Sequence, residues 1–403
     1  MDKSVDNVYN YGDTKSRYSR YLQEIREIVL DSIDLTREVS DEVIEETIEQ
    51  AIGYFCRKNY MPLDDRMRIS HELFCDLRKL DILQELLEDE SVTEIMVNGP
   101  DNIFVEREGR IKRWDKSFYR TEKLEDIIQQ VVSGCNRVVN ESSPIADARL
   151  PDGSRVNVVL KPIALNGPIL TIRKFPKERM TMEKLVEIGA ITGEAADFLK
   201  LLVASKYNIF ISGGTGSGKT TFLNALSDYI PNDERIITIE DAAELSIAHV
   251  DNLVSLESRA SNASGCEPID IRSLIKSALR MRPDRIIVGE IRGIEAIDML
   301  QAMNTGHDGS LCTGHSNSPK DMLSRIETMV LMGMNLPLEA VDRQIASAID
   351  IIVHLGRLRD KSRKVLEIQE VVSYSQGEIR LNPLYLYEDG LKKVGELNNV
   401  SKL

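Results

Sequence analysis

The chain has 403 residues, of which 42% are hydrophobic, and its formal net charge is −14. This length predicts two or three domains, and the acidic balance argues against a general nucleic-acid binder, because neutralising phosphates requires a basic face. No run of about 20 apolar residues occurs, and the polar N-terminus lacks an apolar signal core, so we expect a cytoplasmic protein with no inserted membrane segment.

The cysteines give no sign of a metal or disulfide framework. No C-x-x-C pair occurs, so we expect buried or incidental thiols in a reducing compartment. The five cysteines are Cys56, Cys75, Cys135, Cys266 and Cys312.

The N-terminal part of the chain is expected to be helical. Residues 1–15 are expected to form a disordered tail, and residues 16–85 an N-terminal helical region with apolar residues at helical spacing. The acidic face of the second helix is either solvated or a docking surface for a basic partner. The apolar stripes are Tyr18, Leu22, Ile25 and Val29, followed by Ile44, Ile48 and Ile52.

The pattern changes to short alternating runs separated by turn residues. Asn98-Gly99-Pro100, Glu108-Gly109 and Pro151-Asp152-Gly153 mark hairpin turns between such runs. We therefore expect a small α+β domain over residues 86–176, followed by a linker and helix over 177–195.

The segment "GGTGSGKTT" satisfies the full G-x-x-x-x-G-K-[ST] pattern, with an apolar strand before it and a helical pattern after it. Glycines let the backbone N–H groups of such a loop point at phosphate oxygens, and the helix N-terminus adds partial positive charge. Lys219 is expected to reach the β- and γ-phosphates, and the Thr220 hydroxyl to ligate Mg²⁺, so ATP and Mg²⁺ are the expected cofactors. The candidate nucleotide-binding residues are Gly213, Gly214, Thr215, Gly216, Ser217, Gly218, Lys219, Thr220 and Thr221.

Acidic residues end two later strand patterns. "ERIITIEDAAEL" ends in Glu240 and Asp241, with Glu244 one turn later, and "DRIIVGEIRG" ends in Glu290. Acids at the carboxyl edge of an α/β sheet lie in the ligand crevice. "TGHDGSLCTGHSNSP" then places His307 and His315 on either side of a strand-like centre, where turn or packing roles are the alternative.

The order of these four segments resembles the Walker A, Asp box, Walker B and His box of the type II/type IV secretion ATPase superfamily. The segments "SVTEIMVNGPDNIFVEREGRI" and "RLPDGSRVNVVLKPIALNGPILTIRKF" look like the N-terminal domain of the tight-adherence (Flp) pilus ATPases of CpaF type. The tetracysteine zinc subdomain of many pilus extension ATPases is missing, which favours the CpaF-type and conjugation branch.

The resemblance implies an α/β fold. A RecA-like P-loop NTPase domain with a C-terminal extension, over residues 196–403, is preceded by a PAS-like α+β domain and the helical region. It also implies a homo-hexameric ring, in which arginines of the PAS-like domain reach the phosphates. Arg155 and Arg173 are the best matches, with ordinary surface arginines as the alternative; Arg149, Arg280 and Arg282 match less well.

We interpret the chain as an ATP-hydrolysing motor that acts on an inner-membrane platform protein. Glu240 is expected to polarise the attacking water, and Glu290 with Thr220 to position Mg²⁺ directly or through water; the sequence also allows the two glutamates to exchange these roles. His307 and His315 are expected to sense the γ-phosphate or to stabilise the domain contact. The sequence does not separate pilus assembly from retraction, secretion or conjugation, and a nucleic-acid translocase of the RecA-like class is the more distant alternative.

Overall fold

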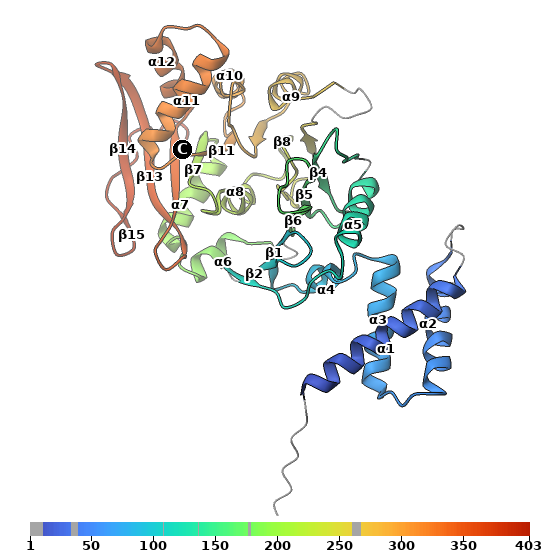
Figure 1. Cartoon of the computed structure of the whole chain (residues 1–403). Helices are drawn as coiled ribbons and strands as arrows, with labels where there is room; N and C mark the ends of the chain where they lie inside the picture. Colours follow the sequence, from blue (N-terminus) through green and yellow to red (C-terminus); the bar gives the residue numbers. More distant parts are fainter. Residues whose placement is uncertain (1–10, 34–38, 108, 136, 176–178, 260–266) are drawn as a thin grey trace, which may run out of the picture. The chain divides into compact units, whose positions relative to one another are not determined.

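The computed structural model describes residues 11–33, 39–107, 109–135, 137–175, 179–259 and 267–403. The chain divides into two compact units, residues 1–177 and 178–403, which are described separately (Figure 1). Within the described ranges, no helix is both long enough and apolar enough to cross a membrane.

Three helices open the first unit and pack into a small bundle. They are α1 (Tyr11–Ser32), α2 (Asp41–Cys56) and α3 (Leu63–Arg78). Ile25, Val29, Ile44 and Ile48 are buried in its core, as the apolar spacing predicts, whereas Tyr18 is only partly buried. Helix α1 begins at Tyr11, before the expected end of the tail at residue 15, and residues 1–10 lie outside the described residues.

The rest of the first unit is a six-stranded antiparallel sheet in the order β3-β2-β1-β6-β5-β4. The β1–β2 and β4–β5 hairpins turn at the expected glycine-containing segments. Helix α5 buries its apolar stripe against one face of the sheet. The elements are α4 (Leu83–Glu88), β1 (Val92–Asn98), β2 (Ile103–Arg107), β3 (Arg110–Arg113), α5 (Thr121–Gly134), β4 (Ile145–Arg149), β5 (Arg155–Val159) and β6 (Ile169–Arg173).

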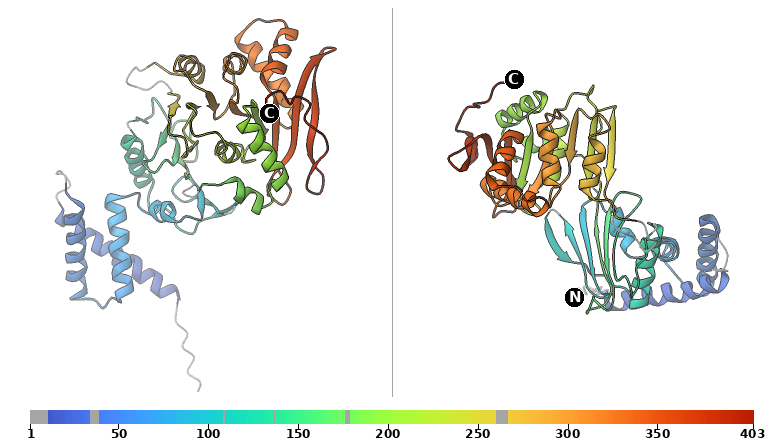
Figure 2. Two further views of the ribbon diagram at one scale, coloured as in Figure 1. Left: turned by 180° about the vertical axis from the view of Figure 1, so that it is seen from behind. Right: turned by 90° about the horizontal axis from the view of Figure 1, so that it is seen from above.

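The second unit is built on a nine-stranded sheet in the order β15-β14-β13-β12-β7-β11-β10-β8-β9. The strands from β12 to β9 are parallel, and β13 to β15 continue the sheet as an antiparallel ribbon (Figures 1 and 2). The strands are β7 (Ile209–Gly213), β8 (Ile236–Glu240), β9 (Leu253–Glu257), β10 (Arg285–Val288), β11 (Leu311–His315), β12 (Ile351–Arg357), β13 (Arg363–Ser375), β14 (Glu378–Tyr387) and β15 (Leu391–Lys393).

Helices cover both faces of this sheet. One face packs against α6 (Met182–Glu187), α7 (Gly193–Ala204) and α8 (Lys219–Ser227). The other packs against α9 (Ile271–Ala278), α10 (Ala296–Asn304), α11 (Pro319–Gly333) and α12 (Leu338–Ala348). The inner parallel strands β7, β8, β10 and β11 are buried on both faces and are therefore mostly apolar in sequence, as in "IFIS" and "RIIV", whereas the edge strand β9 is partly exposed.

The expected linker of residues 177–195 contributes to the second unit. Met182, Leu185 and Ile191 are buried in the core that also holds α7 and α8. Because β7, β8, β10, β11 and β12 run in the same direction, the residues that follow them meet at one edge of the sheet. The P-loop and the acidic segments therefore lie at the same carboxyl edge.

Candidate nucleotide-binding site

The P-loop links the central strand β7 to α8 and is shaped by its first glycine. Gly213 has φ of 155°, and a Cβ at this position would collide with the carbonyl oxygen of Leu355 on β12. Helix α8 begins at Lys219, so the N–H groups of its first turn have no partners within the helix. The end of a buried strand and the start of a helix thus form the anion-binding geometry that the motif predicts.

Lys219 is the charged group at the centre of the loop. Its side chain is largely buried, and Nζ donates to the carbonyl oxygens of Gly213 and Gly214, both at 3.1 Å. Nζ also lies 3.2 Å from Nδ1 of His315, at the end of β11. Burial, more than any neighbouring charge, lowers the pKa of Lys219.

Glu290 receives positive charge from two sides. Arg292 Nη2 donates to Oε2 at 2.7 Å, and His315 Nε2 lies 2.8 Å from Oε1, although outside hydrogen-bond geometry. Burial alone would raise the pKa of Glu290, but the hydrogen bond and charge of Arg292, followed by His315 and Lys219, bring the pKa below its ordinary value. Glu290 is therefore a carboxylate at neutral pH.

His315 connects Lys219 to Glu290. Burial and the charge of Lys219 lower its pKa, so the imidazole is neutral at pH 7. Because the Lys219 ammonium can only donate, Nδ1 is the acceptor and the proton is assigned to Nε2, which faces Glu290. The result is a line of charged and polar groups from Lys219 through His315 and Glu290 to Arg292.

Glu240 ends β8 and is only 4% exposed. Its Oε1 accepts the backbone N–H groups of Glu244 at 2.8 Å and Leu245 at 2.9 Å. Asn224 of α8 holds the same loop, donating to the carbonyl oxygen of Glu244 at 3.0 Å and accepting from the N–H of Ser246 at 2.9 Å. One oxygen of Glu240 thus orders the acidic loop that follows β8.

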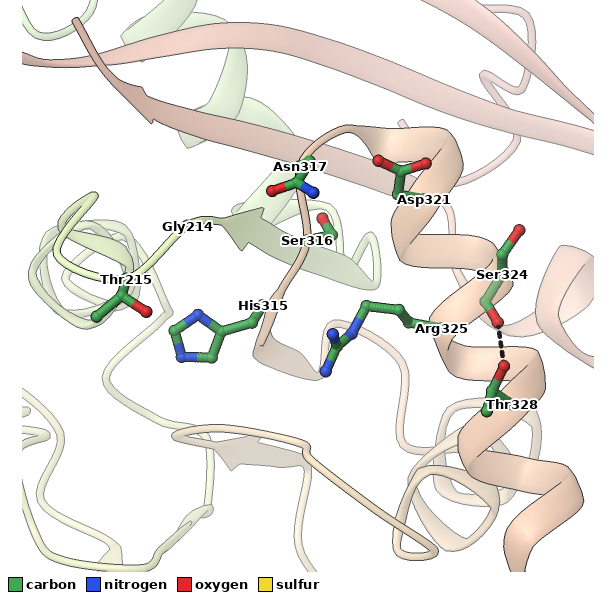
Figure 3. A pocket seen from close by; sticks show the side chains of 9 residues that line it. All are labelled: Gly214, Thr215, His315, Ser316, Asn317, Asp321, Ser324, Arg325 and Thr328. Carbon is green, nitrogen blue, oxygen red and sulfur yellow. Dashed lines mark hydrogen bonds between the residues drawn. The ribbon is translucent and has the colours of Figure 1, made fainter.

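A cavity of about 520 Å³ opens beside the P-loop on the side of β11. Figure 3 shows Thr215 and His315 on one side of this space and the guanidinium of Arg325, from α11, directed toward His315. The lining residues are Gly214, Thr215, His315, Ser316, Asn317, Asp321, Ser324, Arg325 and Thr328. The cavity is open, polar and large enough to admit a phosphate group beside Thr215.

The structure does not bring His307 to this site, so its expected role beside the phosphate needs correction. His307 precedes β11, whereas His315 ends that strand, so the two histidines lie at opposite edges of the sheet. Arg280 and Arg282 precede β10 and belong to the same amino edge as His307. Of the two histidines, only His315 lies at the carboxyl edge beside the P-loop.

Arg155 and Arg173 belong to the first unit and are directly opposite each other on β5 and β6, and Arg155 is likewise opposite Arg149 on β4. Because opposed residues in an antiparallel pair share a face, the three arginines form one row. Their neighbours Val156 and Ile172 point into the core, so the row lies on the face away from α5. Their role at the phosphates stays a prediction.

Sequence reasoning missed three arginines near the loop: Arg292, Arg325 and Arg363. Arg292 stands within the quoted "GEIRG" segment, so its proximity to Glu290 was readable from the sequence. Arg325 follows the His box by a turn and a half of helix, a spacing that carries no signal by itself. Arg363 is 147 residues from Gly216, to whose carbonyl oxygen it donates.

Comparison with known proteins links this site to a family. The family model of type II/IV secretion system proteins matches residues 76–383. The conjugal transfer protein TrbB of Rhizobium radiobacter is 34% identical over 291 residues, which cover 72% of this chain and 86% of that protein. The type IV secretion system protein PtlH of Bordetella pertussis is 32% identical over 315 residues, covering 72% and 93%.

A solved structure supports the fold. The crystal structure of the pilus retraction motor PilT with bound ADP matches with a TM-score of 0.53 at 22% sequence identity. The match covers 80% of this chain and 84% of that one. At this identity the likeness concerns the fold alone.

Proposed function

The chain belongs to the type II/IV secretion system protein family, and we propose that it is an ATP-hydrolysing motor of that family. The observation that carries the proposal is the line from Lys219 through His315 and Glu290 to Arg292, beside a P-loop and an open polar cavity. A P-loop alone supports binding; the carboxylates at the adjacent strand ends support hydrolysis.

Lys219 and the N–H groups at the start of α8 hold the β- and γ-phosphates. The neutral His315 lies between Lys219 and Glu290 at the γ-phosphate end, and Arg325 brings a second positive charge to the same cavity. These groups are fixed by the sheet before the substrate arrives, which lets them stabilise the charge that develops during phosphoryl transfer.

The residues present fit a magnesium ion. Thr220 offers a hydroxyl at the start of α8, and Glu290 offers a carboxylate whose lowered pKa keeps it charged. Mg²⁺ prefers oxygen donors and commonly takes one or two carboxylates together with phosphates and waters. When bound, the ion would neutralise phosphate charge and orient the β- and γ-oxygens.

The two glutamates take different roles in this proposal. Glu290, between Arg292 and His315, supports the metal directly or through water. Glu240, at the end of the neighbouring strand β8, orients and polarises the attacking water, while its Oε1 keeps the loop of residues 241–245 in place.

Assembly into a homo-hexamer belongs to the same proposal. Arg155 and Arg173 complete the phosphate site, and the closing and opening of the two units drives a platform protein at the inner face of the cytoplasmic membrane. Pilus assembly of the tight-adherence (Flp) type is the first candidate process. Conjugal transfer or type IV secretion is the second candidate. It is favoured by similarity to TrbB, a conjugal transfer protein, and to PtlH, a type IV secretion system protein.

Steady-state ATPase measurement tests the proposed activity. Lys219→Ala should reduce turnover to background, because the cation on the β- and γ-phosphates is lost. Lys200→Ala removes the same charge from helix α7 and should leave turnover unchanged. Adding DNA should not stimulate the wild type; strong stimulation would favour a nucleic-acid translocase, and wild-type turnover by Lys219→Ala would contradict the motor.

A strain carrying Lys219→Ala separates the two processes. Loss of pili in electron micrographs with normal plasmid transfer would support the tight-adherence motor. Loss of plasmid transfer or protein secretion with normal piliation would support the second candidate.

A further inference from the structure

The hairpin between β12 and β13 is an unusually basic segment beside the P-loop. Residues 356–364 contain five basic side chains and one acidic one, in a chain whose net charge is −14. The basic residues are Arg357, Arg359, Lys361, Arg363 and Lys364. A local concentration of positive charge in an acidic chain indicates an anionic ligand or partner.

The single acid, Asp360, offsets only one of these five positive charges. Asp360 Oδ1 accepts from the backbone N–H of Ser362 at 2.9 Å and from its hydroxyl at 2.7 Å, and the hydrogen bond from Ser362 lowers the pKa of Asp360. The backbone N–H of Leu358 donates to the carbonyl oxygen of Ser362 at 2.9 Å. The turn is therefore closed by its own contacts, and the hairpin is ordered before any ligand binds.

Strand register directs two of the arginines to the P-loop face. Val353 and Leu355 of β12 point into the core that contains α7 and α8. Side chains alternate along a strand, so Arg357 points to the same face, and Arg363, its direct partner on β13, shares it. This is the face on which α8 begins.

Arg363 touches the P-loop itself. Its Nε donates to the carbonyl oxygen of Gly216 at 3.0 Å, and its Cδ would lie 3.4 Å from a Cβ at Gly218. Gly218 has φ of 92°, so glycine is also required there by the backbone. Among the described residues, the structure records no hydrogen bond or ion pair for the Nη atoms of Arg363, which leaves the outer part of the guanidinium available.

The strand order indicates which end of a nucleotide would reach this hairpin. His315 and Glu290 follow β11 and β10, which lie on one side of β7, whereas β12 lies on the other side. If a triphosphate is held with its γ end at Lys219 and His315, its nucleoside extends toward β12. Arg363 contacts Gly216 from the β12–β13 hairpin, so its guanidinium lies on that side of the P-loop.

We propose that the β12–β13 hairpin is the nucleoside subsite of the phosphate site, with the guanidinium of Arg363 stacked on the nucleobase. Its Nε holds Gly216, and Arg357 supplies positive charge beside it. Arginine suits this role because its plane stacks on an aromatic ring while its edge donates hydrogen bonds. The inference rests on the proposed function, since it requires nucleotide at the P-loop.

Calorimetric titration with two ligands tests the inference. Magnesium–ADP carries a nucleoside, whereas magnesium–tripolyphosphate occupies the phosphate cradle without one. Arg363→Ala should raise the Kd for ADP about tenfold and leave the Kd for tripolyphosphate within about twofold, as expected for a lost cation–aromatic contact. Arg363→Lys should weaken ADP similarly, because lysine retains a donor for Gly216 but has no plane to stack.

Arg380→Ala is the matched control. Arg380 is an exposed arginine on β14, paired with β13 at the end away from residue 363, and its loss should change neither Kd. Equal weakening of ADP and tripolyphosphate by Arg363→Ala would show that Arg363 only shapes the P-loop, and unchanged ADP affinity would place the base elsewhere; either result overturns the subsite. If the wild type binds neither ligand, the proposed function itself fails. If the wild type hydrolyses ATP and Arg363→Ala binds ADP as tightly as the wild type, only the subsite is ruled out.

Discussion

Both ring nitrogens of His315 lie close to charged residues, and the sequence motif alone does not reveal these contacts. Its Nδ1 accepts from Lys219 and its Nε2 faces Glu290, so one neutral ring links the P-loop cation to the carboxylate proposed to support the metal. His307 has the same residue type and a similar sequence context but lies at the other edge of the sheet. The boundaries of β11, rather than the spacing of the histidines, decide which of them lies beside the P-loop.

The roles of the two glutamates should be distinguished by how ATPase activity depends on the Mg²⁺ concentration. Glu240→Gln should retain ATP binding and lose turnover, because the amide keeps the shape and the acceptor oxygen for Glu244 and Leu245 but cannot accept a proton. Glu290→Gln should raise the Mg²⁺ concentration needed for half-maximal activity, because a charged ligand is lost. ATPase activity measured over a range of Mg²⁺ distinguishes them. Wild-type turnover by Glu240→Gln would show that its assignment as the base is wrong.

At the residue scale, the sequence predicted the loop better than its surroundings. The glycine spacing, Lys219 and the strand-ending acids are local signals, and the structure brings Lys219, Glu290 and His315 together. Arg363 reaches Gly216 only because the register of β12 on β7 places the following hairpin there. Such long-range pairing leaves no trace in a local motif.

At the scale of elements, helices α11 and α12 each contribute one carboxyl group to an interacting pair, Glu327 and Asp342. Burial, and then the charge of Asp342, raises the pKa of Glu327 to about 7. Asp342 is itself buried on α12. The protonated form of Glu327 therefore stabilises the folded state at low pH, and this contribution is lost as the pH rises from about 4.5 through about 7.

Glu327→Gln should imitate the protonated form. At pH 8 its melting temperature should exceed that of wild type by about 2–4 °C, the shift that roughly 1 kcal/mol produces in a unit of this size once solvent screening is allowed for. At pH 5 the two proteins should melt within about 1 °C of each other. Glu339→Gln, at an exposed position of α12, is the control. A shift of equal size at both pH values would rule out repulsion between the carboxylates.

The elements themselves were largely readable from apolar spacing. The stripe of Ile44, Ile48 and Ile52 and the runs "IFIS" and "RIIV" became a buried helix face and buried strands. Boundaries were harder: α1 starts before the expected end of the tail, and the expected linker contributes Met182 and Leu185 to a core. Short helices such as α6 gain their stability from packing, so their sequences carry a weak signal.

At the scale of the whole molecule, the first unit should complete the catalytic site. Arg155→Ala and Arg173→Ala should each lower kcat by well over tenfold, because an added guanidinium stabilises the transferring phosphoryl group. ADP affinity should change little, since ADP has no γ-phosphate. Melting temperatures should stay close to wild type, because surface substitutions usually change stability by less than about 0.5 kcal/mol.

Kinetics and light scattering together check this expectation. Arg110→Ala, on the exposed edge strand β3, is the matched control and should retain wild-type turnover. Specific activity of wild type should rise with protein concentration as rings form. Normal turnover in both arginine variants would remove the support for closure of one unit on the other, and a fully active monomer at micromolar concentration would contradict the ring.

The position of β7 in its sheet also determines when the P-loop can acquire its native surroundings during translation. The strand that carries the P-loop pairs with β11 on one side and β12 on the other, and both of these neighbours are encoded much later in the chain. A nascent chain that has emerged only through α8 holds the complete loop motif on a strand whose two edges have no sheet to join. Exposed strand edges of this kind invite pairing with other chains. The P-loop therefore has both of its neighbouring strands only after translation has passed residue 357. A chain truncated before this residue contains the P-loop motif but cannot form the complete site.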